Sequence, residues 1–371
     1  MPGPPKSIDY SRLEQTPFTR RQVASLTLAV IGCGALGSEA ARLLGLLGIG
    51  TVLLIDHDRV EPTNLTHSYY LRSPNVIGCL KADVLAESLA PVFPDTRWLP
   101  VSLEIADTGF ALLKTCDLLL SCTDNTLARV ETAYAAYRLR LPMMDAGLKG
   151  RAVWSGRVAW FPANPVDALS SNSAACYLCQ LSAARRAELL SLSLAASQSC
   201  AQPLDDTGTL ASTPTMASIV AALQVDLGLR LYLLPEPQLE ACAWELDLAL
   251  PQTSWTPFII PRSVDCPFHD VEPQPTPLPM NRPLRETLGQ HSLQLDWPIC
   301  LHARCAVCQH LWTPLVRVAT LRRRTTCPNC NSTQLHSIET LTTLAPTDAA
   351  ALRTPTQLHL PENHLFTLKP I

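Results

Sequence analysis

The stretch that decides the fold is Leu28–Asp58, which reads LAVIGCGALGSEAARLLGLLGIGTVLLIDHD. An apolar run leads into the glycine motif GCGALG, and a helical pattern rich in Ala and Leu follows. A second apolar run, Thr51–Ile55, ends just before Asp56 and Asp58. This order predicts a strand, a glycine turn, a helix and a second strand.

The glycine turn suits a phosphate-bearing ligand. Its glycines let the backbone turn tightly and approach the ligand closely, and the start of the helix offers free N–H groups to negative charge. The glycines concerned are Gly32, Gly34 and Gly37. A carboxylate after the second strand suits a ribose hydroxyl. The motif therefore predicts a nucleotide site, with a dinucleotide as the first interpretation.

Composition sets the broad class of the protein. The chain has 371 residues, enough for more than one domain, and its net charge of −3 gives no bulk attraction to nucleic acid or membranes. The N-terminus has no signal-peptide core, and the longest apolar run, Leu43–Ile55, is too short to span a bilayer. Several of the 14 cysteines form CxxC pairs, which indicates zinc in a reducing compartment. We expect a soluble, cytoplasmic protein that does not bind membranes.

Strand and helix patterns alternate from Leu26 to about Met144. They predict an α/β fold with a Rossmann-like, doubly wound, mostly parallel sheet and helices on both faces. Pro273–Pro283 is rich in proline and indicates a linker before a small Cys-rich unit. The predicted divisions are an N-terminal arm over 1–24, a nucleotide-binding domain over 25–271, a linker over 272–296, a zinc ribbon over 297–336 and a tail over 337–371.

The loop after the second strand carries groups that a dehydrogenase does not need. Asn64, Arg72 and Lys81 follow Asp58, and cations there can neutralise a triphosphate and hold a pyrophosphate leaving group. This favours ATP over a nicotinamide cofactor. Asp124 follows the fourth predicted strand, at the carboxyl edge of the sheet, where its carboxylate can hold Mg²⁺ or cap the next helix.

The motifs GCGALG, DHD, NLxxS and CTDN, with Lys81, together resemble the ThiF/MoeB family, the adenylating domain shared with ubiquitin-activating enzymes, over residues 8–270. The resemblance implies that the C-terminal glycine of a ubiquitin-fold protein attacks the α-phosphate of ATP, giving an acyl adenylate and pyrophosphate. It also implies site roles: the three glycines cradle the nucleotide, Asp56 or Asp58 holds the ribose, Asn64, Arg72 and Lys81 bind phosphates, and Asp124 binds Mg²⁺.

Other residues bear on the same resemblance. Arg12 is similar to a family arginine that reaches the ATP of the other subunit, which implies a homodimer. His67 and Ser68 stand where the family has Arg and Gln, and a neutral imidazole cannot offer a guanidinium fork. We expect either weaker phosphate binding or another arginine, such as Arg20, in its place.

Two sets of Cys and His residues have the spacing of zinc ligands. Cys176 and Cys179 form one pair and Cys266 and His269 another. The resemblance implies that both pairs hold one structural zinc, the alternative being two unrelated buried pairs. The second set has zinc-ribbon spacing and consists of Cys305, Cys308, Cys327 and Cys330. We favour a role for this ribbon in docking a protein, and nucleic acid as the less favoured partner despite Arg322–Arg324.

Cys200 lies in the polar segment SQSCAQPLDD, before a long predicted helix. A mobile, accessible loop suits a nucleophile, and in the family a cysteine of this segment receives the acyl group as a thioester or takes part in sulfur transfer. The alternative is a spare surface thiol. Small residues in Asp145–Gly150 can admit the acyl terminus beside the nucleotide, or form an ordinary strand turn.

These observations predict an ATP-dependent enzyme that activates a ubiquitin-like protein, transfers it to Cys200 and hands it to a conjugating enzyme. No rhodanese-like domain is recognisable, which favours a thioester over a thiocarboxylate product. The alternatives are a sulfur-carrier-protein adenylyltransferase, an adenylating enzyme for small molecules or peptides, a NAD-dependent dehydrogenase and a non-enzymatic binding module. The expected cofactors are ATP, Mg²⁺ and Zn²⁺ at two structural sites.

Overall fold

A computed structural model of the chain describes residues 8–148, 153–163, 174–194, 213–234, 240–270, 276–318, 320–321, 325–362 and 364–371. The sequence predictions that concern Cys200, residues 149–150 and Arg322–Arg324 lie outside these described residues.

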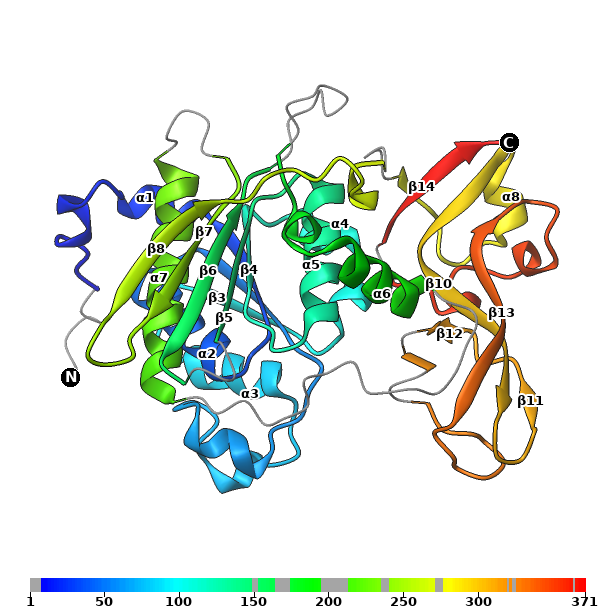
Figure 1. Cartoon of the computed structure of the whole chain (residues 1–371), viewed down its shortest axis with the longest axis horizontal. Coiled ribbons are helices and arrows are strands. Elements are labelled where there is room, and N and C mark those ends of the chain that lie inside the picture. Colours follow the sequence, from blue (N-terminus) through cyan, green and yellow to red (C-terminus); the bar gives the residue numbers. More distant parts are fainter. Residues whose placement is uncertain are drawn as a thin grey trace, which may run out of the picture.

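Figure 1 shows the larger sheet, whose eight strands follow the order β3-β2-β1-β4-β5-β6-β7-β8. The first five in this order pair in parallel, and β6, β7 and β8 continue the sheet in antiparallel pairs. Because β1 lies between β2 and β4, the chain order reverses beside β1, at the switch point where α/β sheets bind ligands. The strands are β1 Thr27–Ile31, β2 Thr51–Ile55, β3 Arg97–Val101, β4 Leu118–Ser121, β5 Met143–Leu148, β6 Ser155–Phe161, β7 Cys242–Asp247 and β8 Ser254–Ile259.

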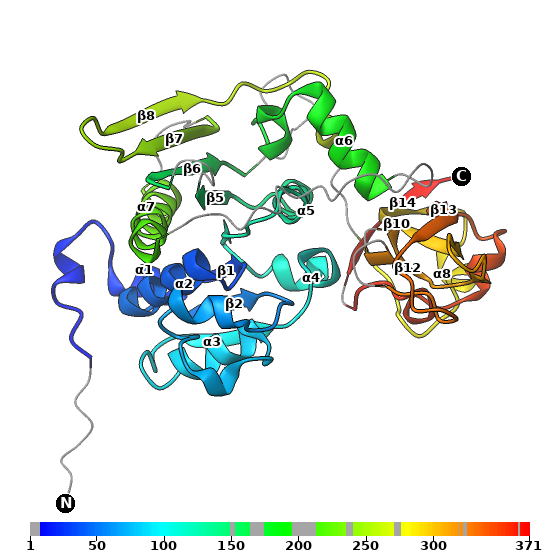
Figure 2. The same cartoon turned by 60° about the horizontal axis from the view of Figure 1, so that its bottom comes forward.

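Helices cover both faces of this sheet (Figure 2). Successive strand residues point to opposite faces, so Leu28 and Val30 of β1 pack into one core with α2, α3 and α7. Ala29 and Ile31 pack into a second core with α4 and α5. The fold predicted from the sequence is therefore confirmed. The helices are α1 Arg20–Ser25, α2 Ala35–Leu47, α3 Lys81–Leu89, α4 Phe110–Leu113, α5 Thr126–Leu139, α6 Ala183–Leu194, α7 Pro214–Leu233 and α8 Leu284–Leu288.

Among the described residues, α7 is long and apolar enough to cross a membrane, by length and composition only. In the fold it is a core helix, because it packs on α2, β5 and β6 with Val220, Val225 and Leu229 buried.

The described residues from Thr276 onward form a second unit around the long strand β10, His291–Cys305. Its six-stranded sheet has the order β11-β10-β14-β9, with β12 and β13 also paired to β10. A separate apolar core includes Leu284, Leu293 and Phe366. The other strands are β9 Thr276–Pro277, β11 Leu311–Trp312, β12 Val316–Arg317, β13 Leu335–Leu344 and β14 Leu365–Pro370.

This unit differs from the divisions expected from the sequence. The expected linker over 272–296 contains β9, α8 and the start of β10, and the expected tail over 337–371 contributes β14. Proline is tolerated in β9 because this strand lies at the sheet edge, where a missing N–H costs little. Leu284 and Leu288 of α8 are buried, so the segment belongs to a folded unit. The ribbon cysteines form one end of a larger β unit.

Arg317 joins the C-terminal unit to the larger domain. This buried arginine of β12 forms ion pairs with Glu104 at 2.6 Å, Asp107 at 2.8 Å and Glu131 at 3.2 Å. Glu131 lies on α5, and Glu104 and Asp107 are the N-cap and the last residue of the short helix η4, Ile105–Asp107, which follows β3. Desolvation of this guanidinium is offset by three negative charges, which also hold the two units in one relative position.

A second buried cluster lies nearby on the same interface. Asp296 of β10 accepts hydrogen bonds from Tyr134 at 2.6 Å and Arg138 at 3.2 Å, both on α5. The other carboxylate oxygen of Asp296 lies 2.8 Å from His364 Nε2. The buried polar side chains of α5 at this interface therefore have hydrogen-bond partners in the C-terminal unit.

We expect this interface to weaken in acid. Burial raises the pKa of Asp296, but His364 and Arg138 outweigh burial and lower that pKa below its ordinary value of 3.8. Ionised Asp296 therefore contributes stability above pH 3.8, and that stability is lost as the pH falls through the lower pKa of the folded state. Urea unfolding between about pH 2 and pH 6 measures the free energy of unfolding of wild type and of Asp296→Asn. The difference between these two free energies should become smaller in acid. A difference that is constant with pH would contradict this prediction.

Candidate active site and metal centres

The glycine loop joins β1 to α2 at the carboxyl edge of the sheet. Gly32 has a φ of 94°, and a Cβ at this position would lie 2.9 Å from the carbonyl oxygen of Cys122. A Cβ at Gly37 would lie only 1.8 Å from the carbonyl oxygen of Gly32. Gly34 is the N-cap of α2 and has open space where a Cβ would stand. The loop thus leaves room for an anion at the start of a 13-residue helix.

Gly37→Ala is expected to displace this loop, because its Cβ would overlap a backbone carbonyl that cannot rotate away. We expect a loss of about 1–3 kcal/mol in unfolding free energy, as for other overpacked positions, together with weaker nucleotide binding. Thermal unfolding and titration with a fluorescent ATP analogue measure the two effects. Gly34→Ala is the matched control for stability, since its Cβ meets no atom. Equal stability of the two variants would refute the packing argument.

Two carboxylates at the end of β2 have different surroundings. Asp56 is buried and accepts hydrogen bonds from the backbone N–H of Cys33 at 2.7 Å and of Asp58 at 2.8 Å. It therefore fixes the glycine loop, and burial raises its pKa. Asp58 is half-exposed, forms an ion pair with Lys81 Nζ at 3.2 Å and lies 3.1 Å from His57 Nε2. Of the two acids expected at the ribose, Asp58 is the one that faces outward.

Lys81 begins α3 beside these carboxylates. Its side chain is only 13% exposed. Burial lowers the pKa of its ammonium group, but the charges of Asp56, Asp58 and, more weakly, Asp124 outweigh burial and raise that pKa. Lys81 is therefore a permanent, partly desolvated positive charge at the carboxyl edge of the sheet.

The loop between β2 and α3 holds the other expected phosphate ligands. The side-chain oxygen of Asn64 accepts a hydrogen bond from a backbone N–H three residues earlier and so stabilises the short helix η2, Pro62–Thr66. Ser68 donates to the buried hydroxyl of Ser38 at 2.9 Å, which ties the loop to α2. His67 Nδ1 contacts a backbone carbonyl of the same loop at 3.0 Å. Arg72 is exposed on this loop.

The loop after β4 lies against the glycine loop and carries Asp124. Cys122 is the residue on which Gly32 packs, so the two loops touch. The helix α5 is capped by Asn125, whose side chain accepts a hydrogen bond from the backbone N–H of Ala128 at 2.7 Å. The alternative in which Asp124 caps that helix is therefore wrong. Asp124 is exposed and lies close enough to Lys81 to affect its pKa.

Sequence reasoning missed two side chains that hold the Asp124 loop. Arg129 of α5 donates to the carbonyl of Thr123 at 2.6 Å and to the carboxylate of Asp145 at 2.7 Å. Gln224 of α7 is fully buried and donates to the carbonyl of Ser121 at 2.9 Å. A basic residue one helical turn after an N-cap is a signal that could have indicated Arg129. A lone glutamine in an apolar helix pattern indicates a buried polar contact without revealing its partner.

The N-terminal arm lies at the other end of the strands. Arg20 donates to the carbonyl of Gly48, lies 4.3 Å from the centre of the Tyr10 ring and forms an ion pair with Asp95 at 3.7 Å. Gly48 and Asp95 precede β2 and β3, so this arm packs at the amino ends of the strands. Arg12 is exposed on the same arm. Neither arginine stands beside the glycine loop of its own chain, so Arg20 does not replace the missing family arginine there.

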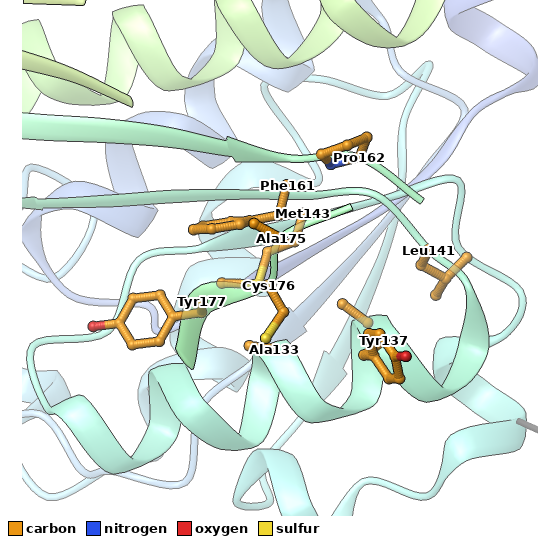
Figure 3. A pocket seen from close by; sticks show the side chains of 10 residues that line it. Ala133, Tyr137, Leu141, Met143, Phe161, Pro162, Ala175, Cys176 and Tyr177 are labelled. Carbon is orange, nitrogen blue, oxygen red and sulfur yellow. The ribbon is translucent and has the colours of Figure 1, made fainter. Parts of the chain in front are cut away.

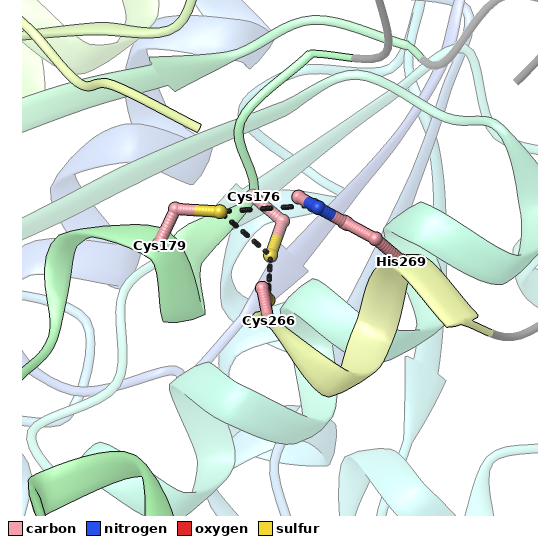
Figure 4. A group of neighbouring side chains, drawn as sticks. All are labelled: Cys176, Cys179, Cys266 and His269. Carbon is pink, nitrogen blue, oxygen red and sulfur yellow. Dashed lines mark hydrogen bonds between the residues drawn. The ribbon is translucent and has the colours of Figure 1, made fainter. Parts of the chain in front are cut away.

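The first Cys and His quartet is assembled as predicted (Figure 4). Cys176 Sγ lies 3.8 Å from Cys179 Sγ and 3.5 Å from Cys266 Sγ, and Cys179 Sγ lies 3.7 Å from His269 Nε2. Ligand atoms of tetrahedral zinc with bonds of 2.0–2.3 Å lie about 3.5–3.8 Å apart, so the spacing fits one zinc. The quartet joins the short helices η5, Tyr177–Gln180, and η6, Pro267–Asp270.

An apolar cavity lies next to this quartet (Figure 3). Its walls include Tyr137, Met143, Phe161 and Cys176. Met143 begins β5 and Phe161 ends β6, so the cavity is at the amino end of β5, opposite the glycine loop. It therefore lies away from the candidate nucleotide site.

The ribbon quartet is also assembled. Cys305 Sγ lies 3.5 Å from Cys330 Sγ, and Cys308 Sγ lies 3.5 Å from Cys327 Sγ. Cys305 ends β10, so this candidate zinc site closes the far end of the strand around which the C-terminal unit is built.

This geometry defines an α/β protein with an open glycine loop, a lysine and an exposed carboxylate at the carboxyl edge of its sheet. The chain belongs to the ThiF family, whose sequence pattern matches residues 13–267. The C-terminal unit, from Thr276 onward, lies beyond that match.

Two curated relatives illustrate the family's range. Ubiquitin-like modifier-activating enzyme 5 of Arabidopsis thaliana is 28% identical over 229 residues, covering 57% of this chain and 48% of the relative. The adenylyltransferase and sulfurtransferase uba4 of Aspergillus fumigatus is 32% identical over 151 residues, covering 40% of this chain and 30% of the relative. The chain thus spans half or less of the length of these relatives. Among solved structures, E. coli MccB with MccA-N7isoASN shares the fold, with a TM-score of 0.50 and 19% identity over 67% of this chain and 69% of that chain.

Proposed function

We propose that the protein activates the C-terminal glycine of a ubiquitin-like protein by adenylation. The main support is that the open glycine loop, the charged Lys81 and the exposed Asp124 lie at the same edge of a ThiF-family sheet. A hydride-transfer site has no use for that lysine and carboxylate, so the dehydrogenase alternative is disfavoured. The names of both relatives, an activating enzyme and an adenylyltransferase, agree with this chemistry.

The reaction follows from the charges at the site. A glycine carboxylate attacks the α-phosphorus of ATP, the bond to the β-phosphate breaks, and pyrophosphate leaves. Lys81 and Arg72 would neutralise the phosphates, the Asn64 amide would donate a hydrogen bond to them, and the half-exposed Asp58 would accept one from a ribose hydroxyl. Asp124 fits a Mg²⁺ ligand because it is an exposed carboxylate beside the cation Lys81, and Mg²⁺ would neutralise charge on the departing pyrophosphate.

Two further parts of the proposal concern the assembly. We place Arg12 in the site of a second copy, because this arginine is exposed at the end of the strands away from its own glycine loop. An active site would then need two protomers. Both quartets are proposed as structural zinc sites, since four protein ligands leave no open position for a substrate.

For the step after adenylation we propose transfer to Cys200. Its thiolate would attack the acyl carbonyl, AMP would leave, and the thioester would pass to a conjugating enzyme. A second candidate is adenylation of a sulfur-carrier protein with a thiocarboxylate product, which the similarity to uba4 supports.

The test is ATP–pyrophosphate exchange with ubiquitin-fold proteins that end in glycine. Exchange is expected with at least one of them, followed by an adduct that thiol reductants cleave on a gel. Cys200→Ala should keep exchange and lose the adduct, whereas Cys116→Ala, at a cysteine that precedes β4 at the opposite end of the strands, should keep both. Absence of exchange with every such protein would refute adenylation. Exchange without an adduct, but with thiocarboxylate formed from a sulfide source, would favour the second candidate.

A further inference from the structure

The loop that carries Asp124 is anchored from three sides. Gln224 of α7 donates to the carbonyl of Ser121, and a second hydrogen bond of 2.9 Å joins the same amide to the carbonyl of Met144 on β5. Asn125 caps α5 directly after Asp124. The third anchor is Arg129, whose guanidinium donates to the carbonyl of Thr123, the residue just before Asp124.

Arg129 is itself held by a buried carboxylate. Its Nη1 lies 2.7 Å from Asp145 Oδ2, and the other oxygen of Asp145 accepts from the Ser121 hydroxyl at 2.8 Å. The side chains of Arg129 and Asp145 are 15% and 5% exposed. The backbone of β5 also makes room for this arginine, because a Cβ at Gly147 would lie 2.4 Å from Arg129 Nη2. One guanidinium therefore bridges β5 and the loop after β4.

We propose that Arg129, held by Asp145, is a positioning residue that sets the Asp124 carboxylate for Mg²⁺-bound ATP. This inference rests on the proposed function and adds a residue to it. The Arg129 guanidinium fixes the peptide that precedes Asp124, and so limits the directions in which that exposed carboxylate can point. Side chains that orient a metal ligand in this way raise the affinity for the metal without touching it.

Lysine in place of Arg129 keeps the charge but has no planar fork, so it cannot bridge Asp145 and the Thr123 carbonyl at once. Arg129→Lys is therefore expected to bind ATP in EDTA as wild type does. The factor by which Mg²⁺ raises its ATP affinity should be about tenfold smaller than in wild type. Isothermal titration of ATP with and without Mg²⁺ measures this gain and needs no protein partner.

A double variant separates positioning from folding. Arg129→Met with Asp145→Leu replaces the buried pair by apolar side chains and should recover thermal stability. It should still lack the Mg²⁺-dependent gain. Arg138→Lys is the matched control, since Arg138 is a buried arginine of the same helix paired with Asp296. It should lower the unfolding temperature and leave the Mg²⁺-dependent gain as in wild type.

The outcomes are distinct. The positioning role is overturned if Mg²⁺ raises the ATP affinity of either Arg129 variant as much as that of wild type. It is also overturned if Arg138→Lys loses as much of this Mg²⁺ effect as Arg129→Lys does. Neither result would contradict adenylation. Failure of the wild-type protein to bind ATP at all overturns the proposed function and this inference with it.

Discussion

Asp124→Ala is expected to reduce ATP–pyrophosphate exchange about 10³-fold, because the charge that develops on pyrophosphate would lose its metal-held counter-charge. Asp124 is exposed and does not cap α5, so the substitution should leave the unfolding temperature unchanged. Exchange rates and thermal unfolding of the purified variant measure the two effects.

The control for this prediction is Asp226→Ala, which removes an exposed aspartate of α7 whose partner is Arg230. It should keep normal exchange. Normal exchange by Asp124→Ala would exclude that residue as the Mg²⁺ ligand.

Cys266→Ala is expected to have the largest effect on stability. Cys266 is fully buried, and its Sγ lies within the quartet that joins η5 to η6. If the quartet binds zinc, the variant loses metal-binding free energy that in small zinc domains is on the order of 10 kcal/mol. Metal analysis should give two zinc ions per wild-type chain, one for each quartet, and one for the variant. Its unfolding temperature should fall sharply.

Cys116→Ala is the matched control, since Cys116 is also buried in the same core but belongs to neither quartet. It should retain both zinc ions and lose only the small packing energy of a thiol. An equal fall in unfolding temperature for the two variants would show that the first quartet does not hold a metal.

The nucleotide edge was predictable because its signals are local. Gly32 and Gly37 lie so close to neighbouring backbone that a side chain would not fit. The turn, helix and strand around them follow one another in sequence. Lys81 was predictable for the same reason, because it begins a helix directly after that loop. The separate surroundings of Asp56 and Asp58 were not predictable, since burial depends on β3 and on the glycine loop rather than on the local sequence.

The C-terminal unit and the anchors of the Asp124 loop depend on long-range contacts. β9, β10 and β14 are joined by pairing between segments far apart in the chain, and each of them contains a proline. Arg129 and Gln224 bind backbone carbonyls that the order of the sheet brings to them. Every residue has a backbone carbonyl, so the sequence does not indicate which carbonyl a side chain will bind.

The buried charges between the two units limit where this chain can be divided. Phe110 and Tyr134 pack on His364 and Trp297 of the C-terminal unit, and Arg138 depends on Asp296 there. A fragment that ended at the family's boundary, near residue 267, would expose those rings and that guanidinium together. Although the family match covers only the larger domain, the shortest chain that keeps α5 fully packed is one that includes the β unit after it.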